Sequence, residues 1–578
     1  MHLRFNWNSA INIDPFDSNT IYFGSQFVHK STDKGLTWEV ISPDLTTNDP
    51  EKQKQSESGG LSMDATGAEN HTTILVIEPS SLEKNMFWVG SDDGRVHYTQ
   101  NGGQSYTEVT KNLKGLPSGS WIVQIKASNK NKGEALLIAN DYRRFNYTPY
   151  AYRTTNYGKS WTRIVDSNDV QSYTLSIVED PEEKNLLFLG TDDGLYVSVD
   201  AGSNWTKWTK GFPTTSVKDL VIHPREHDLV IGTFGRAAWV LDDIRPLRAI
   251  ARDRSTLSRK LNLFQPPTAY DAAYQQPTGS RFGGDALFNG ENRDGGAQIR
   301  YYLTKVKTPK KGKKGDADSE EDKNTPKWDS IHLKIYDGTR QIRHLKTNAP
   351  DSTGIHTMTW RLNEAGGDRP ARRIRKRTNE PGGVTVKPGT YKLVMSYGDQ
   401  TSEQSITVAS DPRLDISQKA INEIYERGKL LQKYTQTAAD AVKQLVESKD
   451  IAKSYEKDLK EKDKEGNKEA IKAAKEIGKE IDTVIALYLG KEDKRQGITR
   501  NPAPTVMRRI GTASQYSSSR PEGMTATEDR LLQHAKEELE EAIEKTNTFF
   551  AEKWTPFETK MKALDVLPFK EIKTIKLD

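Results

Sequence analysis

The chain has 578 residues, enough for roughly three or four domains. Hydrophobic residues make up 34% of it and charged residues 29%, the balance of a very polar protein whose core is spread over small units. The net charge of +5, from 85 basic and 80 acidic side chains, is too close to neutral for a dedicated nucleic-acid-binding protein. The chain has no cysteine, which excludes disulfides, thiol catalysis and cysteine-ligated metals.

Apolar runs and catalytic motifs set further limits. No run approaches the roughly 18 apolar residues that cross a bilayer, so we expect no membrane span. Residues 1–9 read MHLRFNWNS and lack the apolar core of a secretory signal peptide. Because no H-E-x-x-H, G-x-S-x-G or phosphate-loop pattern occurs, we expect neither a metal nor a cofactor.

An octet of the form S-x-D-x-G-x-x-W organises the first part of the chain. It reads SVDAGSNW at residues 198–205, and three related octets begin at residues 31, 99 and 154. The oxygen of the third residue can accept hydrogen bonds within its own turn, and the glycine supplies a positive φ. The closing aromatic offers a large face for packing between sheets. We assign structural roles to the third and eighth residues, which are Asp33 and Trp38, Asn101 and Tyr106, Asn156 and Trp161, and Asp200 and Trp205.

Each octet lies in a module of four short predicted strands. The second strand ends in glycine, or once in alanine, at residues 21–24, 86–90, 135–139, 186–190 and 229–232. Modules of about 40–50 residues with four strands are typical of β-propeller blades. The fifth module has no octet. We therefore predict that residues 1–245 form β-propeller blades in an incomplete ring, with an exposed edge strand within residues 8–24.

The second predicted domain, residues 258–412, is a small Ig-like β-sandwich. Its strands are expected at residues 331–336, 341–345, 356–361 and 390–397, where short extended runs lack any helical period. The insertion at residues 305–327 is basic and then acidic, which is typical of a disordered loop. A second charged stretch, residues 369–377, holds six basic residues. It fits either a loop that binds phosphate or sulfate, or a solvated loop.

The third predicted domain, residues 413–578, is an up-down α-helical bundle. Apolar residues at three-to-four spacing predict helices at residues 415–447, 450–489, 526–552 and 555–564. Thr525 and Glu528 fit a capping box at the start of one of them. Residues 491–523 are expected to form a long polar connection. The chain is thus predicted to be multidomain and mainly β, with a spacer or docking element at its helical end.

The chain resembles secreted bacterial proteins with sortilin-type Asp-box (BNR) propellers, which are often labelled glycosyl hydrolases. The strings that carry the resemblance are WVGSDDG at 88–94, YRTTNYGKSW at 152–161, VIHPREHDLVIGT at 221–233, WVLDDI at 239–244, GAQIRYYL at 296–303 and DPRL at 411–414. Family members usually carry an export signal and more propeller before this point, so the resemblance is to their C-terminal portion. It implies an extracytoplasmic location. The incomplete ring predicts association with a missing N-terminal propeller half, a partner chain or another copy.

Strand counting locates a candidate ligand site. The turn between the second and third strands of each blade lies on the face opposite the octets, where propellers usually bind ligands. The third such turn reads DYRRFNYTPY at 141–150 and offers rings for stacking and arginines for anions. Two others contain Asp-Asp-Gly, which is also an ordinary hairpin-turn sequence. The residues expected to bind ligand are Tyr142, Arg143, Arg144, Phe145, Asp92, Asp192 and Arg236.

Two functions fit these residues. The first is a non-catalytic binding or scaffold propeller that captures a protein, peptide or glycan on this face. The second is a glycoside hydrolase resembling the Asp-box xyloglucanases, with Asp93 and Asp193 as the paired carboxylates. A hydrolase needs one carboxyl whose pKa is raised by burial, whereas a binding surface depends on the rings and arginines. We favour the binding propeller.

Overall fold

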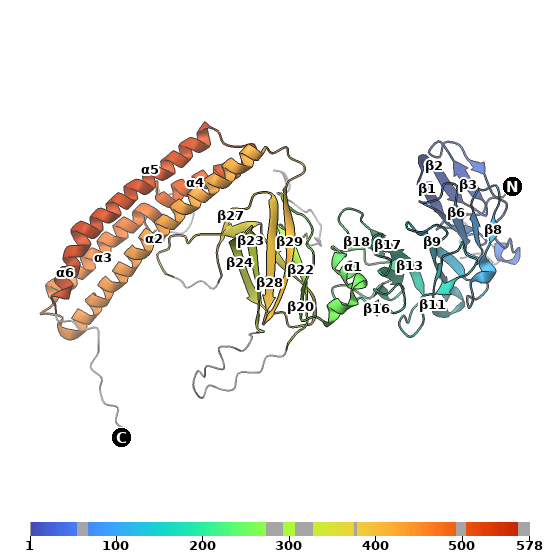
Figure 1. The fold of residues 1–578 in the computed structure, drawn as a ribbon, viewed down its shortest axis with the longest axis horizontal. Helices are drawn as coiled ribbons and strands as arrows, with labels where there is room; N and C mark the ends of the chain where they lie inside the picture. Colours follow the sequence, from blue (N-terminus) through green and yellow to red (C-terminus); the bar gives the residue numbers. More distant parts are fainter. Residues whose placement is uncertain are drawn as a thin grey trace, which may run out of the picture. The chain divides into compact units, whose positions relative to one another are not determined.

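The computed structural model describes residues 2–54, 67–272, 293–306, 328–374, 379–492 and 504–564. The chain divides into two compact units, Met1–Arg259 and Lys260–Asp578 (Figure 1). Most of the charged insertion predicted at 305–327, and residues 375–377 of the basic stretch, lie outside the described residues.

The first unit is built from five antiparallel sheets, each formed by consecutive strands, which we call blades 1 to 5. Their strands are β1 (Ile11–Asp14), β2 (Asp17–Gly24), β3 (Val28–Ser31) and β4 (Glu39–Val40); β5 (Ile74–Pro79), β6 (Phe87–Ser91), β7 (Val96–Thr99) and β8 (Thr107–Glu108); β9 (Trp121–Ala127), β10 (Ala135–Asp141), β11 (Asn146–Thr154) and β12 (Thr162–Arg163); β13 (Thr174–Glu179), β14 (Leu187–Thr191), β15 (Gly194–Ser198) and β16 (Thr206–Lys207); and β17 (Val217–Ile222), β18 (Leu229–Thr233) and β19 (Ala238–Leu241). The first strands β1, β5, β9, β13 and β17 contact one another in turn. The predicted propeller blades are thus confirmed.

A short helix closes the first unit. The helix α1 (Arg245–Arg252) follows β19, and a 3-10 turn continues to Ser258. The guanidinium of Arg248 is buried and donates to Asp180 at 2.7 Å, while Arg252 reaches Glu183 at 3.1 Å. Because both acids lie between β13 and β14, these contacts tie α1 to blade 4 and place residues 245–258 in the propeller unit.

All four octets close their turns by the same hydrogen bonds. In the fourth, the Ser198 hydroxyl accepts from Gly202 N at 2.9 Å and donates to Asp200 at 2.8 Å, and Asp200 accepts from Asn204 N at 2.9 Å. Where the third residue is Asn156, its carbonyl oxygen accepts from Ser160 N at 3.0 Å in the same way. The glycine of every octet has a positive φ, between 73° and 96°. Asparagine therefore replaces aspartate without loss of the acceptor that orders the turn.

The aromatic that ends the second, third and fourth octets packs against the blade before it. Tyr106 donates to the Ile41 carbonyl at 3.3 Å, and Trp205 Nε1 donates to the Ile164 carbonyl at 2.7 Å. Trp161 lies edge-on to Trp88 of blade 2 at 5.8 Å. These acceptors and rings belong to the preceding blade in each case. Trp38 of blade 1 contacts Phe23 of its own blade and is 43% exposed, whereas Trp205 is 6% exposed.

Removing an octet tryptophan should therefore have different effects in different blades. Trp205→Ala leaves a cavity between blades 3 and 4 and should lower the free energy of unfolding by about 3–5 kcal/mol. Trp38→Ala removes a half-exposed ring and should cost less than about 1 kcal/mol. Chemical denaturation of both variants measures the two losses. An equal loss in both would contradict a role in packing between blades.

The second unit begins with two facing β-sheets. Its strands are β20 (Leu261–Leu263), β21 (Ala269–Asp271), β22 (Ala297–Leu303), β23 (Ser330–Asp337), β24 (Arg340–Asn348), β25 (Gly354–Trp360), β26 (Asn363–Ala365), β27 (Gly382–Thr385), β28 (Gly389–Tyr397) and β29 (Gln400–Ser410). One sheet has the order β20-β22-β25 and the other β21-β29-β28-β23-β24. Ile299 and Trp360 from the first and Leu333 and Leu393 from the second share one buried core. This is a β-sandwich; its description as Ig-like stays a prediction.

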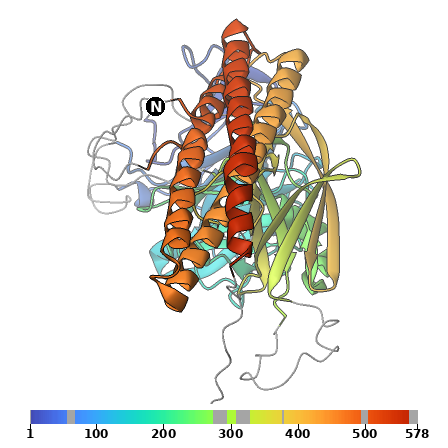
Figure 2. The same ribbon diagram turned by 90° about the vertical axis from the view of Figure 1, so that its left-hand side faces the viewer.

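The helical region follows, with helices that run alongside one another (Figure 2). They are α2 (Gln418–Asp463), α3 (Lys468–Leu489), α4 (Val506–Ser518), α5 (Ala526–Phe549) and α6 (Thr555–Lys562), with a π-helical turn at Phe550–Trp554. They enclose one apolar core that includes Leu445, Ile481, Ile510 and Leu539. The capping box at Thr525 and Glu528 is present.

Two predictions about the helices were wrong. The break expected after residue 447 is absent, because α2 continues to Asp463. Its buried positions recur every seven residues through that region, at Leu431, Ala438, Leu445, Ala452 and Leu459, so one apolar seam is kept against its neighbours. The polar connection expected at 491–523 contains α4, which starts at Val506. The side chain of the preceding residue, Thr505, caps the helix by accepting from Arg508 N at 3.3 Å.

One buried carboxylate joins the sandwich to α2. Glu364, at the end of the sandwich, accepts from Arg340 at 2.9 Å, Tyr425 at 2.7 Å and Lys429 at 3.0 Å. Burial alone would raise the pKa of Glu364, but the hydrogen bonds from Arg340, Tyr425 and Lys429 lower it to about 2. Gln432 adds a contact, donating to the Ala365 carbonyl at 3.1 Å.

Glu364→Gln should destabilise the second unit by about 1.5–3 kcal/mol, because it removes the charge that accepts from Arg340 and Lys429, while both cations stay partly solvated. Since the pKa is lowered from 4.5 to about 2, this stabilisation should be present above pH 4.5 and lost as the pH falls through 2. The control Glu403→Gln, which removes a half-exposed ion pair with Lys392, should cost at most about 1 kcal/mol. Urea denaturation measures both; similar losses would contradict the role of Glu364.

Candidate ligand-binding face

The face opposite the octets is formed by two kinds of segment. In each blade, the turn between the second and third strands lies beside the residues that lead into the first strand. Backbone hydrogen bonds show this: Asp92 N donates to Thr73 O at 3.0 Å, Asp192 N to Tyr173 O at 3.2 Å, and Phe234 N to Ser216 O at 2.9 Å. The lead-in residues thus belong to the same surface as the turns.

Arg143 lies on this face, on the short 3-10 turn Tyr142–Arg144. Its guanidinium carbon is 3.4 Å from the ring centroid of Trp121 and 4.4 Å from that of Tyr142. Tyr142 in turn stacks on Tyr173 at 4.5 Å, with the planes 22° apart. We call Trp121, Tyr142, Arg143 and Tyr173 the aromatic–arginine cluster. Partial burial among the rings lowers the pKa of Arg143 from 12.5, and the group remains a cation.

Within the described residues, no hydrogen bond or ion pair occupies the guanidinium of Arg143. Its flat face rests on Trp121, and the side chain as a whole is exposed. The N–H groups along the edge of the guanidinium are therefore available to an incoming acceptor. A planar cation fixed in this way is suited to bidentate hydrogen bonding.

Polar and apolar groups surround the cluster. Asp192 accepts from the Ser216 hydroxyl at 2.5 Å and from the hydroxyl of Tyr173. Lys218 lies 5.8 Å from the ring of Phe234, and its pKa is lowered by burial while Asp192 opposes the shift. Phe234 and Phe145 are largely exposed. The face thus combines cations, a carboxylate and accessible rings.

The predicted ligand residues are placed as follows. Tyr142 and Arg143 belong to the cluster, and Asp192 borders it through Tyr173. Arg144 pairs with Asp141 at 2.6 Å. Phe145, with φ of 60°, and Arg236 are exposed. Asp92 is different, because its side chain is fully buried.

Asp92 lies beneath the surface, where it accepts from Thr73 N at 2.9 Å and Thr73 Oγ1 at 2.7 Å. Burial raises its pKa to about 7. His71 Nδ1 is 3.6 Å from Asp92 Oδ1, but this nitrogen accepts from Thr72 N at 2.8 Å, and burial lowers the pKa of His71 to about 4. The imidazole is neutral near pH 7, so the contact is not an ion pair.

The two proposed catalytic carboxylates are engaged by their surroundings. Asp93 accepts from Thr47 N and Thr47 Oγ1, both at 2.6 Å, and from Ser91 Oγ at 2.5 Å. Asp193 accepts from Thr191 Oγ1 at 2.7 Å and from Lys207 at 2.6 Å. Burial would raise the pKa of Asp193, but Lys207 and Thr191 lower it. The raised pKa that a general acid requires is found at Asp92, whose oxygens are closed off from solvent.

Sequence reasoning missed Trp121, Tyr173, His71 and Lys218, because it considered only the turns between second and third strands. The signal was available: a first strand begins at the end of the sheet where the second strand finishes. Aromatic residues just before or at the start of β9 and β13 were therefore candidates for the same face.

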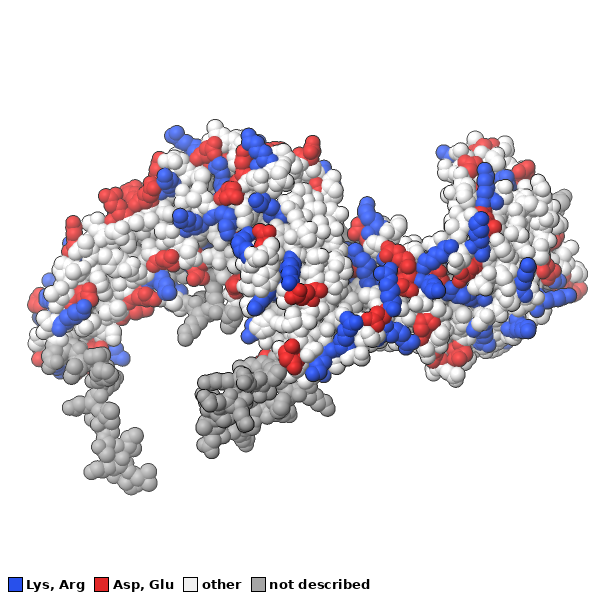
Figure 3. All heavy atoms as spheres, viewed as in Figure 1, with Lys and Arg blue, Asp and Glu red and all other residues white. Residues whose placement is uncertain are grey.

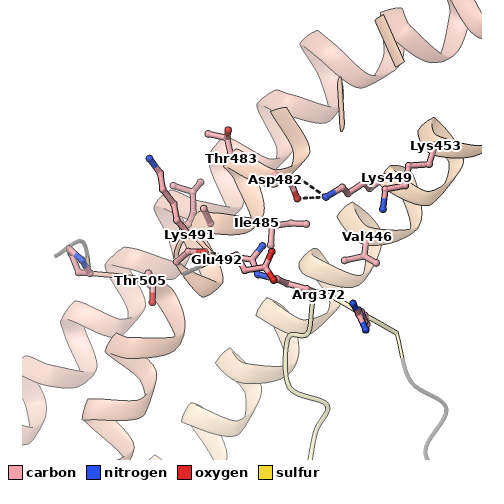
Figure 4. Close-up of a pocket in the computed structure, with 15 residues that line it drawn as sticks. Arg372, Val446, Lys449, Lys453, Asp482, Thr483, Ile485, Lys491, Glu492 and Thr505 are labelled. Carbon is pink, nitrogen blue, oxygen red and sulfur yellow. Dashed lines mark hydrogen bonds and ion pairs between the residues drawn. The ribbon is translucent and has the colours of Figure 1, made fainter. Parts of the chain in front are cut away.

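A hollow in the second unit contains part of the basic stretch (Figure 4). It measures about 840 Å³, and the basic residues Arg372, Arg373, Lys449, Lys453 and Lys491 line it. Two of these already have partners: Lys449 pairs with Asp482 at 2.5 Å, and Arg372 donates to the carbonyl of Gly490 at the end of α3. These contacts fasten the loop and α2 to α3, and whether the basic stretch binds phosphate or sulfate stays a prediction.

Charges of both signs are interspersed on the visible face of the described residues (Figure 3). Across the described ranges, no group of three or more histidine or acidic side chains is arranged to hold a metal ion. None of the helices described is long and apolar enough to cross a bilayer.

Raising the pH should destabilise the first unit through Asp92. Its pKa of about 7 in the folded state exceeds the ordinary value of 3.8, so the folded state keeps a proton that the unfolded state has lost. The free energy of unfolding should therefore fall as the pH rises from about 4 through 7. Asp92→Asn stays neutral and should lack this dependence. Urea unfolding at about pH 5 and pH 8 compares the two proteins. If the difference in their free energies of unfolding were the same at both pH values, the raised pKa of Asp92 would be contradicted.

Comparisons with known proteins concern the propeller unit. The family model described as "Sortilin, neurotensin receptor 3," matches residues 150–248. Among solved structures, the chain is similar to the GH74 xyloglucanase from Xanthomonas campestris, with 16% identity, a TM-score of 0.32, and coverage of 41% of this chain and 36% of that one. It is also similar to YCF48 from Cyanidioschyzon merolae, with 14% identity, a TM-score of 0.28, and coverage of 42% and 67%. None of the curated proteins matches.

The chain covers 36% of the length of each of two GH74 proteins to which it is similar, one from Xanthomonas campestris and one from Niastella koreensis. Likeness at this level concerns a kind of fold and carries no statement about activity. The family match runs from within β11 of blade 3 through blade 5 and includes two octets and Tyr173. Trp121, Tyr142 and Arg143 precede the matched residues. The first unit is thus built of Asp-box propeller blades, and residues 150–248 of it are similar to the sortilin family.

Proposed function

We propose that the first unit is a non-catalytic binding or scaffold propeller that captures a protein, peptide or glycan on the face opposite the Asp boxes. One observation carries this proposal: the guanidinium of Arg143 lies flat on Trp121, with its N–H edge unoccupied among the described residues. A solvent-facing cation fixed by rings is a feature of binding surfaces, where arginine and aromatic residues supply most of the affinity.

The cluster offers two kinds of contact to one ligand. The rings of Tyr142 and Tyr173 can stack on a sugar, a peptide plane or an aromatic side chain. Arg143 can donate two parallel hydrogen bonds to a carboxylate, sulfate or carbonyl group. Because these residues come from blades 3 and 4, the ligand would lie across neighbouring blades, and the packing of the blades would fix the shape of the site.

The hydrolase alternative finds less support in the geometry. A glycoside hydrolase needs two accessible carboxylates on opposite sides of the scissile bond. Asp93 and Asp193 are instead acceptors for Thr47, Ser91, Thr191 and Lys207. Hydrogen bonds of this kind are typical of carboxylates that stabilise turns.

An extracytoplasmic location, periplasmic, surface or secreted, is part of the proposal and is supported by the resemblance to sortilin-type proteins.

Glycan and peptide arrays probed with the full chain should identify the ligand class. Arg143→Ala and Tyr142→Ala should each weaken capture by at least about tenfold, since each removes an anchor near the centre of the interface. The control Arg225→Ala removes an equally accessible arginine from the loop between β17 and β18, on the octet side, and should leave capture unchanged. Loss of capture in the control as well would argue against this face.

A reducing-sugar assay on the captured glycans separates the two functions. We expect no turnover, and only modest changes in binding for Asp93→Asn and Asp193→Asn. Turnover that disappears in either variant while binding is retained would establish a glycoside hydrolase and overturn the proposal.

A further inference from the structure

A third cation joins Arg143 and Arg144 on the candidate ligand face. Lys52 lies on a short 3-10 turn in the connection between blades 1 and 2. Its ammonium group meets the Arg144 guanidinium beside Gly119. A Cβ on Gly119 would lie 3.6 Å from Lys52 Nζ and 3.8 Å from Arg144 Nη1. Because Gly119 is only two residues before Trp121, whose ring supports Arg143, all three cations lie around one short stretch of backbone.

Two of these cations act on the same buried group. The ring of His71 lies edge-on to the indole of Trp121 at 5.9 Å. Burial lowers the pKa of His71 to about 4, and the positive charges of Lys52 and Arg143 add to this shift. The charged ends of Lys52 and Arg143 therefore lie close enough together to reach one ligand.

All three cations keep N–H groups that are open to a ligand. Neither Lys52 nor Arg143 makes a hydrogen bond or an ion pair with any described residue. Arg144 pairs with Asp141 through Nε at 2.6 Å, which leaves its two terminal nitrogens available. The side chains of Arg143 and Arg144 are exposed. Donors from three side chains are thus present at one place.

The carboxylates nearby accept hydrogen bonds from other groups. Asp92 and Asp93 are buried and accept from hydroxyl and backbone N–H groups of their surroundings. Asp192 accepts from two hydroxyl groups, and Asp49 accepts from Glu51 N at 3.0 Å. None of these acids is hydrogen-bonded to Lys52 or Arg143 in the part of the chain that the structure describes, so an anionic ligand would not have to displace them.

Tyrosine rings continue the surface beside the cations. Tyr142 stacks on Tyr173 at 4.5 Å, and Tyr147 lies 6.1 Å from Tyr173 and is 53% exposed. Arg143 borders these rings, with its guanidinium carbon 4.4 Å from the centroid of Tyr142. A tyrosine ring has an apolar body and a polar tip, which match the C–H face and the hydroxyl groups of a sugar.

From this arrangement we propose that the ligand is a polysaccharide that carries sulfate ester groups. A sulfate ester has three terminal oxygens, one for each of Lys52, Arg143 and Arg144, and a neighbouring sugar stacks on the tyrosine rings. A carboxylate has two oxygens and fits the fork of a single arginine. The inference rests on the proposed function, because it names the class of ligand for the same face.

Binding of the full chain to immobilised dextran sulfate tests this class of ligand, with unmodified dextran and carboxymethyl-dextran as matched polymers. We expect dextran sulfate to be captured, carboxymethyl-dextran to be captured more weakly, and unmodified dextran not to be captured. Lys52→Gln should weaken capture of dextran sulfate by about five- to tenfold, as expected for the loss of one charge-assisted hydrogen bond. The control Lys84→Gln removes the same charge from an exposed position between β5 and β6, on the octet side, and should bind as wild type does.

Three results would overturn the sulfate assignment: no capture of dextran sulfate, equal capture of the sulfated and carboxymethylated polymers, or equal effects of Lys52→Gln and Lys84→Gln. A tyrosine-sulfated peptide that is captured more tightly than dextran sulfate would overturn the assignment to a polysaccharide. The proposed function stands after any of these results if Arg143→Ala still weakens capture of the ligand found on the arrays. If Arg143→Ala leaves that capture unchanged, the binding face itself is wrong.

Discussion

Packing of each blade on the one before it is the contact on which the first unit depends. The fourth strands are only two residues long, so an isolated blade has little sheet to stabilise it. Stability comes from apolar rows between sheets and from the octet aromatic, which reaches the preceding blade. Trp205, buried and bonded to the Ile164 carbonyl, shows the complete arrangement, and Trp38 shows the same residue without its neighbour.

The candidate ligand face follows from this packing. Trp121 and Tyr142 come from blade 3 and Tyr173 from blade 4, and their rings meet because the two sheets are held against each other. The buried Asp92 and the neutral His71 form the layer beneath Trp121. A surface assembled from several rigid sheets keeps its cation and rings in place before a ligand arrives, which reduces the entropy lost on binding. The turns and strand starts carry the side chains that can bind a ligand, and the packing of the blades fixes the positions of these side chains.

Local sequence patterns predicted much of the fold. The C-terminal ends of the glycine-ended strands were predicted within two residues, because strand alternation and turn chemistry are short-range properties. The length of α2 was missed, since its seven-residue seam is visible only when the partner helices are known. Half of the cluster was missed for a related reason. Trp121 reaches Arg143 through the pairing of β9 with β10, and Tyr173 reaches Tyr142 because blade 4 packs on blade 3, and no local pattern contains either relation. The exposure of Trp38 was unforeseen, because the octet reads alike in every blade.

Hydrogen exchange followed strand by strand tests the dependence of each blade on its neighbours most directly. We expect slow exchange in β10 and β14, which are buried between sheets, and faster exchange in β1 and β19, which are partly exposed. Exchange of β1 as slow as that of β10 would contradict the account, because a strand with an exposed face would then be as stable as one packed on both sides.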